Sequence, residues 1–278
     1  MNHTLARILS GMIPARKLRH RAREFLLRPR VAKIRGVENV LDRYSLLISY
    51  SQFAEDIVLY KYLHAVRNGY YIDVGAADPE VLSVTKFFYD RGWSGLNVEP
   101  RDDVIKLYEE RRPRDTNVEI AVSDRKGRCS FFVGGEDSTM NAEDARRQGI
   151  TREISVEMDT LAGVLQRYSI PADVHFLKID VENHEREVLL GMDFAAVRPW
   201  LVAIESTIPG TLLPNHKGWE PILLRNGYSL LASHVINRYY VANERKAELE
   251  SAALDFSRIR YLTNEQYLAL GRNPPAVG

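Results

Sequence analysis

The stretch YYIDVGAADPE, residues 70–80, decides the fold that this sequence predicts. It opens with branched and aromatic residues and then reaches Asp73 and Gly75, where a buried strand would turn toward a helix. A glycine at such a turn lets the backbone approach a bound ligand closely. The dinucleotide fingerprint G-x-G-x-x-G is incomplete, because Ala77 and Glu80 replace its second and third glycines. Two acids in this turn would repel a pyrophosphate and favour a cationic ligand such as S-adenosylmethionine.

Strand-like and helix-like runs alternate along the chain on both sides of this stretch. Short runs rich in branched residues lie at 70–74, 95–99, 118–122, 175–180 and 201–205. Helical patterns lie at 51–66, 84–92, 102–112 and 184–192. This alternation predicts an α/β fold with a mostly parallel, doubly wound sheet that binds ligands at the carboxyl ends of its strands. An antiparallel pair, at 227–233 and 238–243, is expected to complete the sheet.

Local signals add detail at three places. Ser51 is the expected cap of the first helix, and the capping-box pattern from Thr263 to Gln266 predicts a last helix. A polar loop, residues 134–149, is too long for a tight turn and is expected to act as a flap. The side chains of this loop that could close over a cofactor are Ser138, Thr139 and Asn141.

The composition indicates an ordinary globular protein. Of 278 residues, 45% are apolar and 27% are charged, which is enough for a full buried core. No uncharged apolar run approaches the roughly 20 residues of a membrane-spanning helix, and no signal peptide is recognised. The single cysteine, Cys129, excludes an internal disulfide and fits a reducing compartment. We therefore expect a cytoplasmic protein.

The net charge of +1 conceals an asymmetry. Residues 1–36 hold ten Lys or Arg against one acid, which is +9, so the remainder of the chain is −8. We therefore divide the chain into a basic helical arm, residues 1–45, and a domain, residues 46–278. As an amphipathic helix opened by Pro14, the arm could lie on an anionic membrane at its inner face, receive an anionic substrate, dock on a partner or pack on its own acidic domain. No nucleic-acid partner is expected, because no basic stripe with aromatic residues continues into the domain.

Acidic side chains follow the predicted strands at the edge where ligands bind. Glu99 ends the second strand, where an acid can accept hydrogen bonds from the ribose hydroxyls of an adenosine. NAD could use the same acid, and a surface glutamate before a proline turn is the plain alternative. Asp180, Glu182 and His184 follow the fourth strand, and Glu205 ends the neighbouring one.

Six motifs lie in a fixed order between roughly residues 50 and 230. They are SQFAEDIVL, YIDVGAADP, SVTKFFYDRGWSGLNVEP, VEIAVSD, VEMDTL and FLKIDVENHEREVLLGM. In this order they resemble the FkbM family of S-adenosylmethionine-dependent methyltransferases. The resemblance implies a class I, Rossmann-like fold with a seven-stranded sheet, and methylation of hydroxyl oxygens on sugars, glycolipids or polyketide-type metabolites. It also implies the cofactor contacts: Asp73, Gly75 and Ala77 beside the methionine part, Glu99 at the ribose, Ser123 and Asp124 at the adenine, and Asp180 at the reactive end.

The chain departs from the family pattern at three positions. The family commonly has glycine where Ala54 and Asn183 stand, and the position of His184 is often filled by alanine. The change at Ala54 looks harmless. Asn183 alters a backbone turn and offers an extra oxygen ligand, which leaves the role of His184 open.

The implied reaction requires in-line attack by a hydroxyl oxygen and loss of its proton, so a base or a metal ion is expected. In the first hypothesis, His184 is the general base, and Asp180 or Glu182 orients its imidazole. In the second, Asp180 and Glu205 hold Mg²⁺ together with Asn183 or His184. The plain alternative makes His184 a helix N-terminal residue and the acids complements of the helix dipole.

The acceptor and the broader function remain open alternatives in the sequence. His216 and Trp219 follow the fifth strand and, with Glu205, are candidate acceptor contacts, although for Trp219 a place in the core is the favoured interpretation. Rival functions are an N- or carboxyl-methyltransferase and a non-catalytic or NAD-type nucleotide-binding protein. A homo-oligomer is also open.

Overall fold

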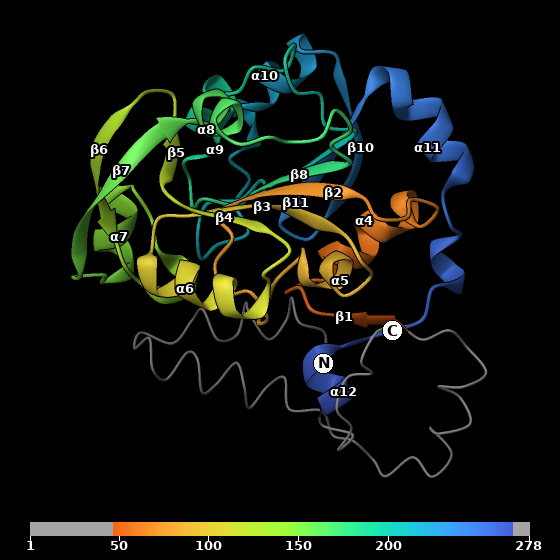
Figure 1. Cartoon of the computed structure of the whole chain (residues 1–278), viewed down its shortest axis with the longest axis horizontal. Helices are drawn as coiled ribbons and strands as arrows, with labels where there is room; N and C mark the ends of the chain where they lie inside the picture. The colour runs from red at the N-terminus through yellow and green to blue at the C-terminus, as the bar shows by residue number, and fades with distance from the viewer. Residues whose placement is uncertain (1–46, 269–278) are drawn as a thin grey trace.

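The computed structural model describes residues 47–268, so the basic arm expected over residues 1–45 lies outside the described part of the chain. A seven-stranded sheet runs through the centre, with the order β10-β11-β9-β8-β2-β3-β4 (Figure 1). The strands from β9 to β4 are parallel, and β11 is antiparallel to both of its neighbours. The seven strands are β2 (Tyr70–Val74), β3 (Ser94–Glu99), β4 (Thr116–Glu119), β8 (Phe176–Ile179), β9 (Leu201–Glu205), β10 (Tyr228–His234) and β11 (Asn237–Ala242).

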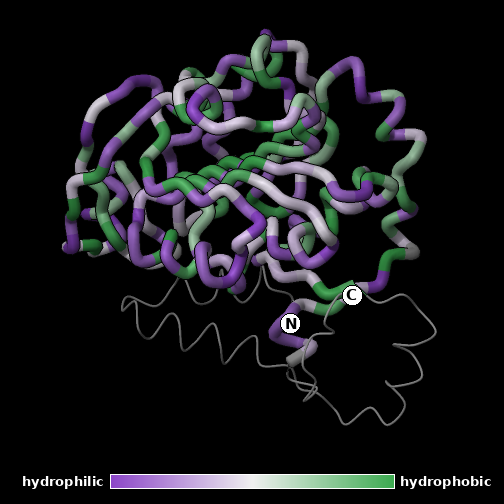
Figure 2. The backbone as a smooth tube through the Cα atoms, viewed as in Figure 1, coloured by the Kyte–Doolittle hydropathy of each residue, from purple (hydrophilic) through white to green (hydrophobic). Residues whose placement is uncertain are grey.

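Helices cover both faces of this sheet (Figure 1). One layer contains α8 (Leu161–Arg167), α9 (Glu185–Leu190) and α10 (Glu220–Arg225). The other contains α4 (Glu55–Leu63), α5 (Lys86–Tyr89) and α11 (Lys246–Ala252), while α6 (Asp102–Arg111) lies beside β3 and β4. Because successive side chains of a strand point to opposite faces, Ile72 packs in the first layer and Tyr71 in the second. The hydrophobic residues gather along the sheet between the helices (Figure 2).

The run 118–122, expected as one strand, is two strands of different sheets. β4 pairs with β3 in the main sheet, whereas β5 (Ala121–Ser123) pairs with β7 (Glu153–Thr160) in a three-stranded sheet that also contains β6 (Gly127–Phe132). Ile120 separates them and is buried. Every residue near this break suits a strand, so the pattern alone could not reveal where the chain leaves the main sheet. The small sheet carries the short helix η1 (Gly135–Asp137) and α7 (Ala142–Gln148) between β6 and β7.

The first helix begins later than its sequence pattern predicts. Ser51 does not cap it; the Ser51 hydroxyl instead donates to the carboxylate of Asp56, at 2.8 Å, as does the hydroxyl of Ser49, at 2.7 Å. The chain then passes through Ala54 in the left-handed region, with φ 63°, before α4 starts at Glu55. Ser51 still meets the first turn of α4, because its Oγ accepts a hydrogen bond from the backbone N of Asp56 at 3.4 Å, but the N-cap position belongs to Ala54.

The C-terminal part returns to the start of the described chain. β1 (Leu47–Ser49) pairs in parallel with β12 (Tyr261–Thr263), which no sequence pattern indicated. The capping box is confirmed, because the backbone N of Thr263 donates to Gln266 Oε1 at 2.9 Å and the N of Gln266 donates to Thr263 Oγ1 at 3.2 Å. It opens α12 (Asn264–Leu268). Within residues 47–268, no helix has the length and apolarity required to cross a membrane.

Candidate functional site

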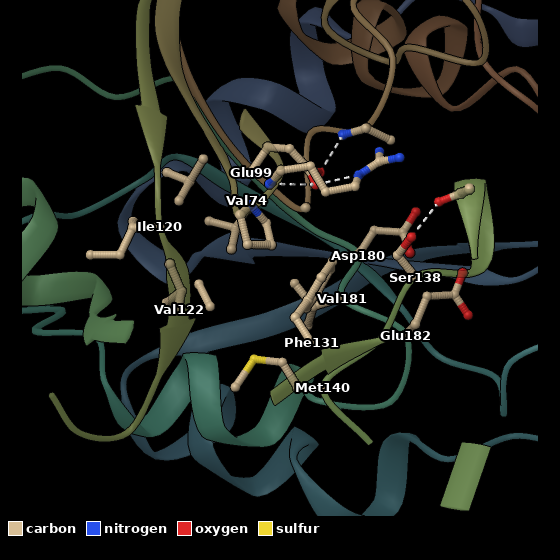
Figure 3. A pocket seen from close by; sticks show the side chains of 17 residues that line it. Val74, Glu99, Ile120, Val122, Phe131, Ser138, Met140, Asp180, Val181 and Glu182 are labelled. Atoms are coloured by element: carbon tan, nitrogen blue, oxygen red, sulfur yellow. Dashed lines mark hydrogen bonds and ion pairs between the residues drawn. The ribbon is translucent and has the colours of Figure 1, made fainter. Parts of the chain in front are cut away.

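Two cavities meet at the carboxyl ends of β2, β8 and β9. We call the first the apolar cavity; it has a volume of about 520 Å³ and opens partly to solvent (Figure 3). Its walls are mostly hydrophobic, with polar groups at one side. Its hydrophobic side chains are Val74, Val98, Ile120, Val122, Phe131, Met140 and Val181. We call the second, of about 960 Å³, the acidic cavity, because its charged lining residues are six acids and one lysine. They are Glu55, Asp78, Asp137, Lys178, Asp180, Glu182 and Glu205.

The turn after β2 forms part of the border between the cavities. Gly75 and Ala77 line both of them, as expected of a turn that approaches a ligand. Gly75 has φ 76°, and a Cβ there would lie 1.9 Å from the carbonyl oxygen of Asp180, so only glycine fits. Ala77 also has a positive φ, of 50°. The ends of β2 and β8 thus lie so close together that a side chain at position 75 would push them apart.

Glu99 fixes this turn to the end of β3. Its side chain is buried, Oε2 accepts a hydrogen bond from the backbone N of Ala77 at 3.1 Å, and Oε1 accepts one from Arg101 Nε at 2.8 Å. A carboxylate oxygen can accept more than one hydrogen bond, so Glu99 keeps acceptor capacity for a ligand in the apolar cavity that it lines. Its carboxylate lies beside the turn in Figure 3.

Asp73 does not contact either cavity, contrary to its expected place beside a ligand. Its side chain points to the opposite layer of the sheet from Ile72, where Thr85 Oγ1 donates to it at 2.9 Å. Lys178 Nζ lies 3.2 Å from Asp73 Oδ1 and donates to the carbonyl oxygen of Gly75 at 2.7 Å. Asp73 therefore acts on the turn indirectly, through Lys178.

Lys178 remains charged in this buried position. Burial lowers the pKa of its ammonium, but the carboxylates of Asp73 and Asp180 outweigh that effect and raise the pKa above its ordinary value. Asp180 lies 3.7 Å from Lys178 Nζ. The ammonium is thus shared between a backbone carbonyl and two carboxylates.

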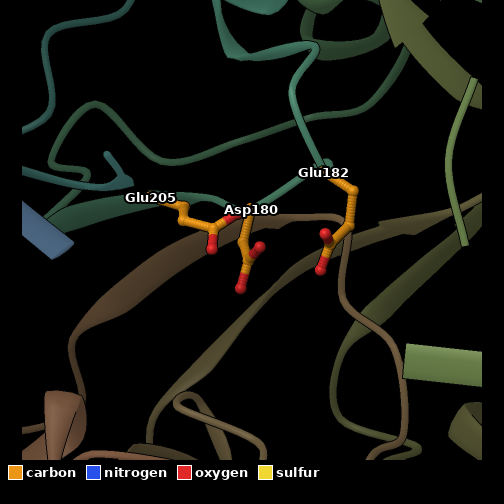
Figure 4. A group of neighbouring side chains, drawn as sticks. All are labelled: Asp180, Glu182 and Glu205. Atoms are coloured by element: carbon orange, nitrogen blue, oxygen red, sulfur yellow. The ribbon is translucent and has the colours of Figure 1, made fainter. Parts of the chain in front are cut away.

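Three carboxylates meet where the cavities join (Figure 4). Asp180 follows β8, Glu182 lies two residues later with φ 54°, and Glu205 ends β9. One oxygen from each lies within 4.8 Å of the others, an arrangement that could hold a metal ion. Oxygen ligands of this kind suit Mg²⁺. We call this group the carboxylate triad.

The structure separates His184 and Asn183 from the triad. His184 Nε2 lies 3.0 Å from Ser123 Oγ, and its Nδ1 lies 3.6 Å from Glu187, so neither Asp180 nor Glu182 orients the imidazole. Burial lowers the pKa of this imidazole. Asn183 donates from Nδ2 to Asp144 at 2.8 Å. Neither residue lines either cavity. The expectation that Asp180 or Glu182 orients His184 as a general base is therefore wrong, and so is the expectation that Asn183 or His184 joins a metal site here.

Four other expected contacts lie away from both cavities. Ser123 is buried with its hydroxyl between His184 and Asp124, while its neighbours Ala121 and Val122 line the apolar cavity instead. Trp219 is core, 2% exposed, with its ring edge-on to Tyr240. His216 packs beside Trp219. The expected residues that line neither cavity are Ser123, Asp124, His216 and Trp219. Glu205 is the expected acceptor contact that does line one.

The loop expected as a flap forms one wall of the apolar cavity. Ser138 and Met140 line it, and Thr139 Oγ1 donates to the carbonyl oxygen of Glu182 at 2.9 Å. Phe131 and Met140 were missed in the sequence, although Phe131 shortly precedes the polar loop and Met140 is the one large apolar residue within it. Glu55 was missed as well, because an acid within an amphipathic helix looks like a solvated one.

The sequence matches the model of a known protein family. The model of the methyltransferase FkbM domain matches residues 73–230, which is more than half of the chain. No curated protein matches the sequence.

Solved structures of methyltransferases are similar only weakly. An O-methyltransferase from Bacillus cereus in complex with SAH is 11% identical over 78% of this chain and 93% of its own, with a TM-score of 0.41. A magnesium protoporphyrin IX methyltransferase from Synechocystis PCC 6803 with bound SAM is 10% identical over 67% and 76%, with a TM-score of 0.40. A methyltransferase from Geobacter sulfurreducens is 13% identical over 84% and 99%, with a TM-score of 0.38.

Proposed function

Because the chain belongs to the methyltransferase FkbM domain family, we propose that it moves the methyl group of S-adenosylmethionine to a hydroxyl oxygen of a sugar, glycolipid or polyketide-type metabolite. The observation that carries the choice of a hydroxyl is the carboxylate triad, Asp180, Glu182 and Glu205, at the border of the two cavities. A hydroxyl must lose a proton during transfer, and the triad offers acceptors for it.

The apolar cavity fits the adenosine part of the cofactor. Its aliphatic and aromatic walls suit the faces of an adenine ring, and Glu99 suits the ribose hydroxyls. Asp180 and Glu182 would then lie toward the cationic part, because they line both cavities.

S-adenosylmethionine, when bound, supplies a methyl carbon that its sulfonium makes electrophilic. The protein has to hold an acceptor oxygen in line with that carbon and to take its proton. A carboxylate is too weak a base to ionise an alcohol beforehand. A carboxylate is a strong enough base to take the proton during the transfer itself, because the hydroxyl becomes strongly acidic once its oxygen begins to bond to the methyl carbon. In this role a triad oxygen accepts the hydrogen bond of the acceptor hydroxyl and then holds its proton.

The triad also supports the metal-assisted form of the same reaction. Mg²⁺, where it is bound, would supply a Lewis acid that lowers the pKa of the acceptor hydroxyl. Asp180, Glu182 and Glu205 would hold it through carboxylate oxygens. Asn183 and His184 take no part, because their side chains contact Asp144 and Ser123.

A carboxylate acceptor is disfavoured by the charge of the acidic cavity. Two like charges about 6 Å apart repel by roughly 3 kcal/mol at an effective dielectric constant of about 20. Six acids line this cavity, so an anionic acceptor would meet several such repulsions. A hydroxylated acceptor meets none.

Calorimetry followed by a transfer assay tests the proposal. We expect S-adenosylmethionine to bind and NAD not to bind, and we expect labelled methyl groups to enter hydroxylated compounds in a screen of sugar and glycolipid extracts. The same screen with EDTA separates the two forms of the reaction, since only the metal-assisted form is lost. Binding of NAD alone would overturn the proposal, and methylation confined to amines or carboxylates would overturn the choice of a hydroxyl.

A further inference from the structure

A third cavity lies at the opposite edge of the sheet from the other two. It has a volume of about 810 Å³ and opens partly to solvent. Its walls come from the end of α4, the turn before β2, the end of α5 and the turn before β3. We call it the basic cavity, because the charged side chains among the described residues that line it are two arginines, Arg67 and Arg91, and no acid.

Arg91 keeps one edge of its guanidinium group free. Its Cζ lies 3.5 Å from the centre of the Phe87 ring, which covers one face of the group, and its Nη1 donates to the carbonyl oxygen of Phe87 at 3.0 Å. Within residues 47–268, Nε and Nη2 have no hydrogen-bond partner, and no ion pair forms with this side chain. The Nε and Nη2 edge is a pair of parallel donors that can bind an oxyanion in bidentate form.

The charge of Arg91 is poorly balanced in this position. Burial lowers the pKa of its guanidinium, and neighbouring groups, Asp56 and Asp90 among them, offset that effect only in part. The helix α5 that precedes Arg91 is four residues long, so its dipole balances only a small part of the charge. An anion bound in the cavity would remove this cost.

Two further groups of the cavity are without partners. Arg67 is exposed, and it forms no ion pair or hydrogen bond in the part of the chain that the structure describes. An exposed arginine is ordinary by itself, but this one lines the same cavity as Arg91. His64 Nδ1 is a buried atom with no hydrogen-bond partner among the described residues. The His64 ring and the Arg91 guanidinium adjoin the same side chain, at 6.2 Å and 5.9 Å from the centre of the Tyr60 ring.

The combination of these groups selects a phosphate among oxyanions. A phosphate monoester carries about two negative charges above pH 7, which matches two guanidinium groups, and its three terminal oxygens can accept hydrogen bonds from several side chains at once. A carboxylate has one charge and two oxygens. Half-buried side chains of the same cavity, Tyr60 and Val66, offer apolar surface to an organic group beside the phosphate.

We propose that the basic cavity binds a phosphate monoester with an apolar or aromatic organic group. Arg91 and Arg67 hold the phosphate oxygens, and Tyr60 contacts the organic group. β2 is five residues long, so roughly 15 Å separates this edge of the sheet from the carboxylate triad. The bound ester is therefore neither the methyl donor nor its acceptor, and the inference does not depend on the proposed function.

Three anions test the proposal on the full chain: phenyl phosphate, inorganic phosphate and benzoate. Their binding is measured at pH 8 by ligand-observed NMR, with and without S-adenosylhomocysteine. We expect phenyl phosphate to bind with a Kd below about 1 mM, and the other two anions to bind at least about tenfold more weakly. S-adenosylhomocysteine should not displace phenyl phosphate. Displacement would place this ligand in the cofactor site and overturn the proposal, as would the absence of binding.

Substitutions locate the site. Arg91→Gln and Arg67→Gln should each weaken the binding of phenyl phosphate at least about fivefold, because glutamine keeps polar atoms but not the charge. Arg225→Gln, which changes an exposed arginine of α10 outside the cavity, should bind as the wild type does. Residues 1–36 are the same in every variant, so binding to that basic arm would persist in all of them.

Two results would contradict the assignment. Equal affinities of Arg67→Gln and Arg225→Gln for phenyl phosphate would overturn the site, and this comparison holds even if Arg91→Gln does not fold, because Arg67 is exposed. Inorganic phosphate or benzoate that binds as tightly as phenyl phosphate would overturn the choice of an organic phosphate.

Discussion

Glu99 joins two strand ends through a single carboxylate. Its oxygens accept hydrogen bonds from the turn after β2 and from Arg101, while the side chain lines the apolar cavity. In Glu99→Gln, one oxygen becomes an NH₂ group that cannot accept and that faces another donor. We therefore expect the affinity for S-adenosylhomocysteine to fall at least about tenfold in calorimetry, because a charge-assisted hydrogen bond contributes roughly 1.5–3 kcal/mol.

Glu119 provides the matched control for this change. It stands opposite Glu99 in the register of β3 and β4, but its side chain is exposed. Glu119→Gln should bind S-adenosylhomocysteine with wild-type affinity. If both variants bind as the wild type does, Glu99 holds the turn without touching the cofactor.

Glu205 lines the acidic cavity and not the apolar one, so its role in turnover can be separated from cofactor binding. Glu205→Gln should lower kcat about 100-fold, as expected when a proton acceptor is lost. The dissociation constant of S-adenosylhomocysteine should change by less than about threefold. His184→Ala serves as the comparison and should retain most of the activity, because its ring contacts Ser123 and Glu187 instead of the cavity. A loss of turnover in His184→Ala alone would restore the histidine as the base.

We expect the buried carboxyl of Glu185 to make the free energy of unfolding depend on pH. Its carboxyl is buried, and burial raises its pKa from 4.5 to about 7, although the backbone N atoms of Val181 and Asn183 donate to it. The folded state therefore binds the proton more tightly than the unfolded chain does. The contribution of this carboxyl to the free energy of unfolding is therefore fully present below pH about 4.5. It is lost as the pH rises through about 7, a change of roughly 3 kcal/mol.

Glu185→Gln removes this titration and keeps the oxygen that accepts from the backbone. We expect the difference in free energy of unfolding between pH 5 and pH 8, measured with urea, to be smaller in this variant than in the wild type. Glu109→Gln, which changes an exposed glutamate of α6, should keep the wild-type difference. An unchanged pH dependence in Glu185→Gln would show that the carboxyl titrates at an ordinary pH.

The site residues that could be predicted are those whose backbone position decides their role. Gly75, Ala77 and the triad stand at strand ends, and parallel strands bring their carboxyl ends together at one edge of a sheet. Ser123 and His184 also stand near this edge but turn away from it. The direction of a side chain after a strand ends depends on local φ and ψ, as at Glu182, and no periodic pattern records those angles.

At the scale of elements, the strands between residues 70 and 205 could be predicted because their continuous apolar runs reflect burial on both faces. The pairing of β1 with β12 could not, since each is three residues long and 200 or more positions separate them. The position at which the run 118–122 divides was hidden for a different reason. The chain passes from one sheet to another within residues that suit either.

The loop of residues 134–149, which we expect to act as a flap and call the flap, is attached to the rest of the site by a small hydrogen-bond network. Asn183, with φ 74°, donates to Asp144 of α7 and accepts from Asn215 Nδ2 at 3.3 Å. In Asn183→Gly, the backbone strain is relieved but both side-chain contacts are lost. We expect faster hydrogen exchange in residues 135–149 and an affinity for S-adenosylhomocysteine that falls about threefold or more.

Asn68→Gly separates the two effects of that substitution. Asn68 also has a positive φ, of 52°, and it lies in an exposed turn before β2. This variant relieves comparable strain without touching the flap, so exchange in residues 135–149 should match the wild type. Equal exchange in Asn183→Gly and the wild type would mean that the flap is held by its packing alone.

At the scale of the whole molecule, charge is divided along the chain. Residues 1–36 carry +9 and the remainder −8. Part of that negative charge lies in the acidic cavity, where it would disfavour an anionic acceptor. This weakens the hypothesis that the arm delivers an anionic substrate, and it leaves an anionic membrane, a partner or the chain's own acidic domain as the surface that the arm contacts.

A membrane surface gives the sharpest test of these alternatives. Each Lys or Arg near an anionic bilayer contributes roughly 1 kcal/mol, so ten of them would bind the full chain to vesicles that contain phosphatidylserine. We expect the full chain to sediment with such vesicles at low salt, to be released as the ionic strength rises, and not to sediment with neutral vesicles. Deletion of residues 1–36 should abolish sedimentation and leave the affinity for S-adenosylhomocysteine unchanged. If the intact protein does not bind and the deletion instead lowers its melting temperature, the arm packs on its own domain and the membrane hypothesis fails.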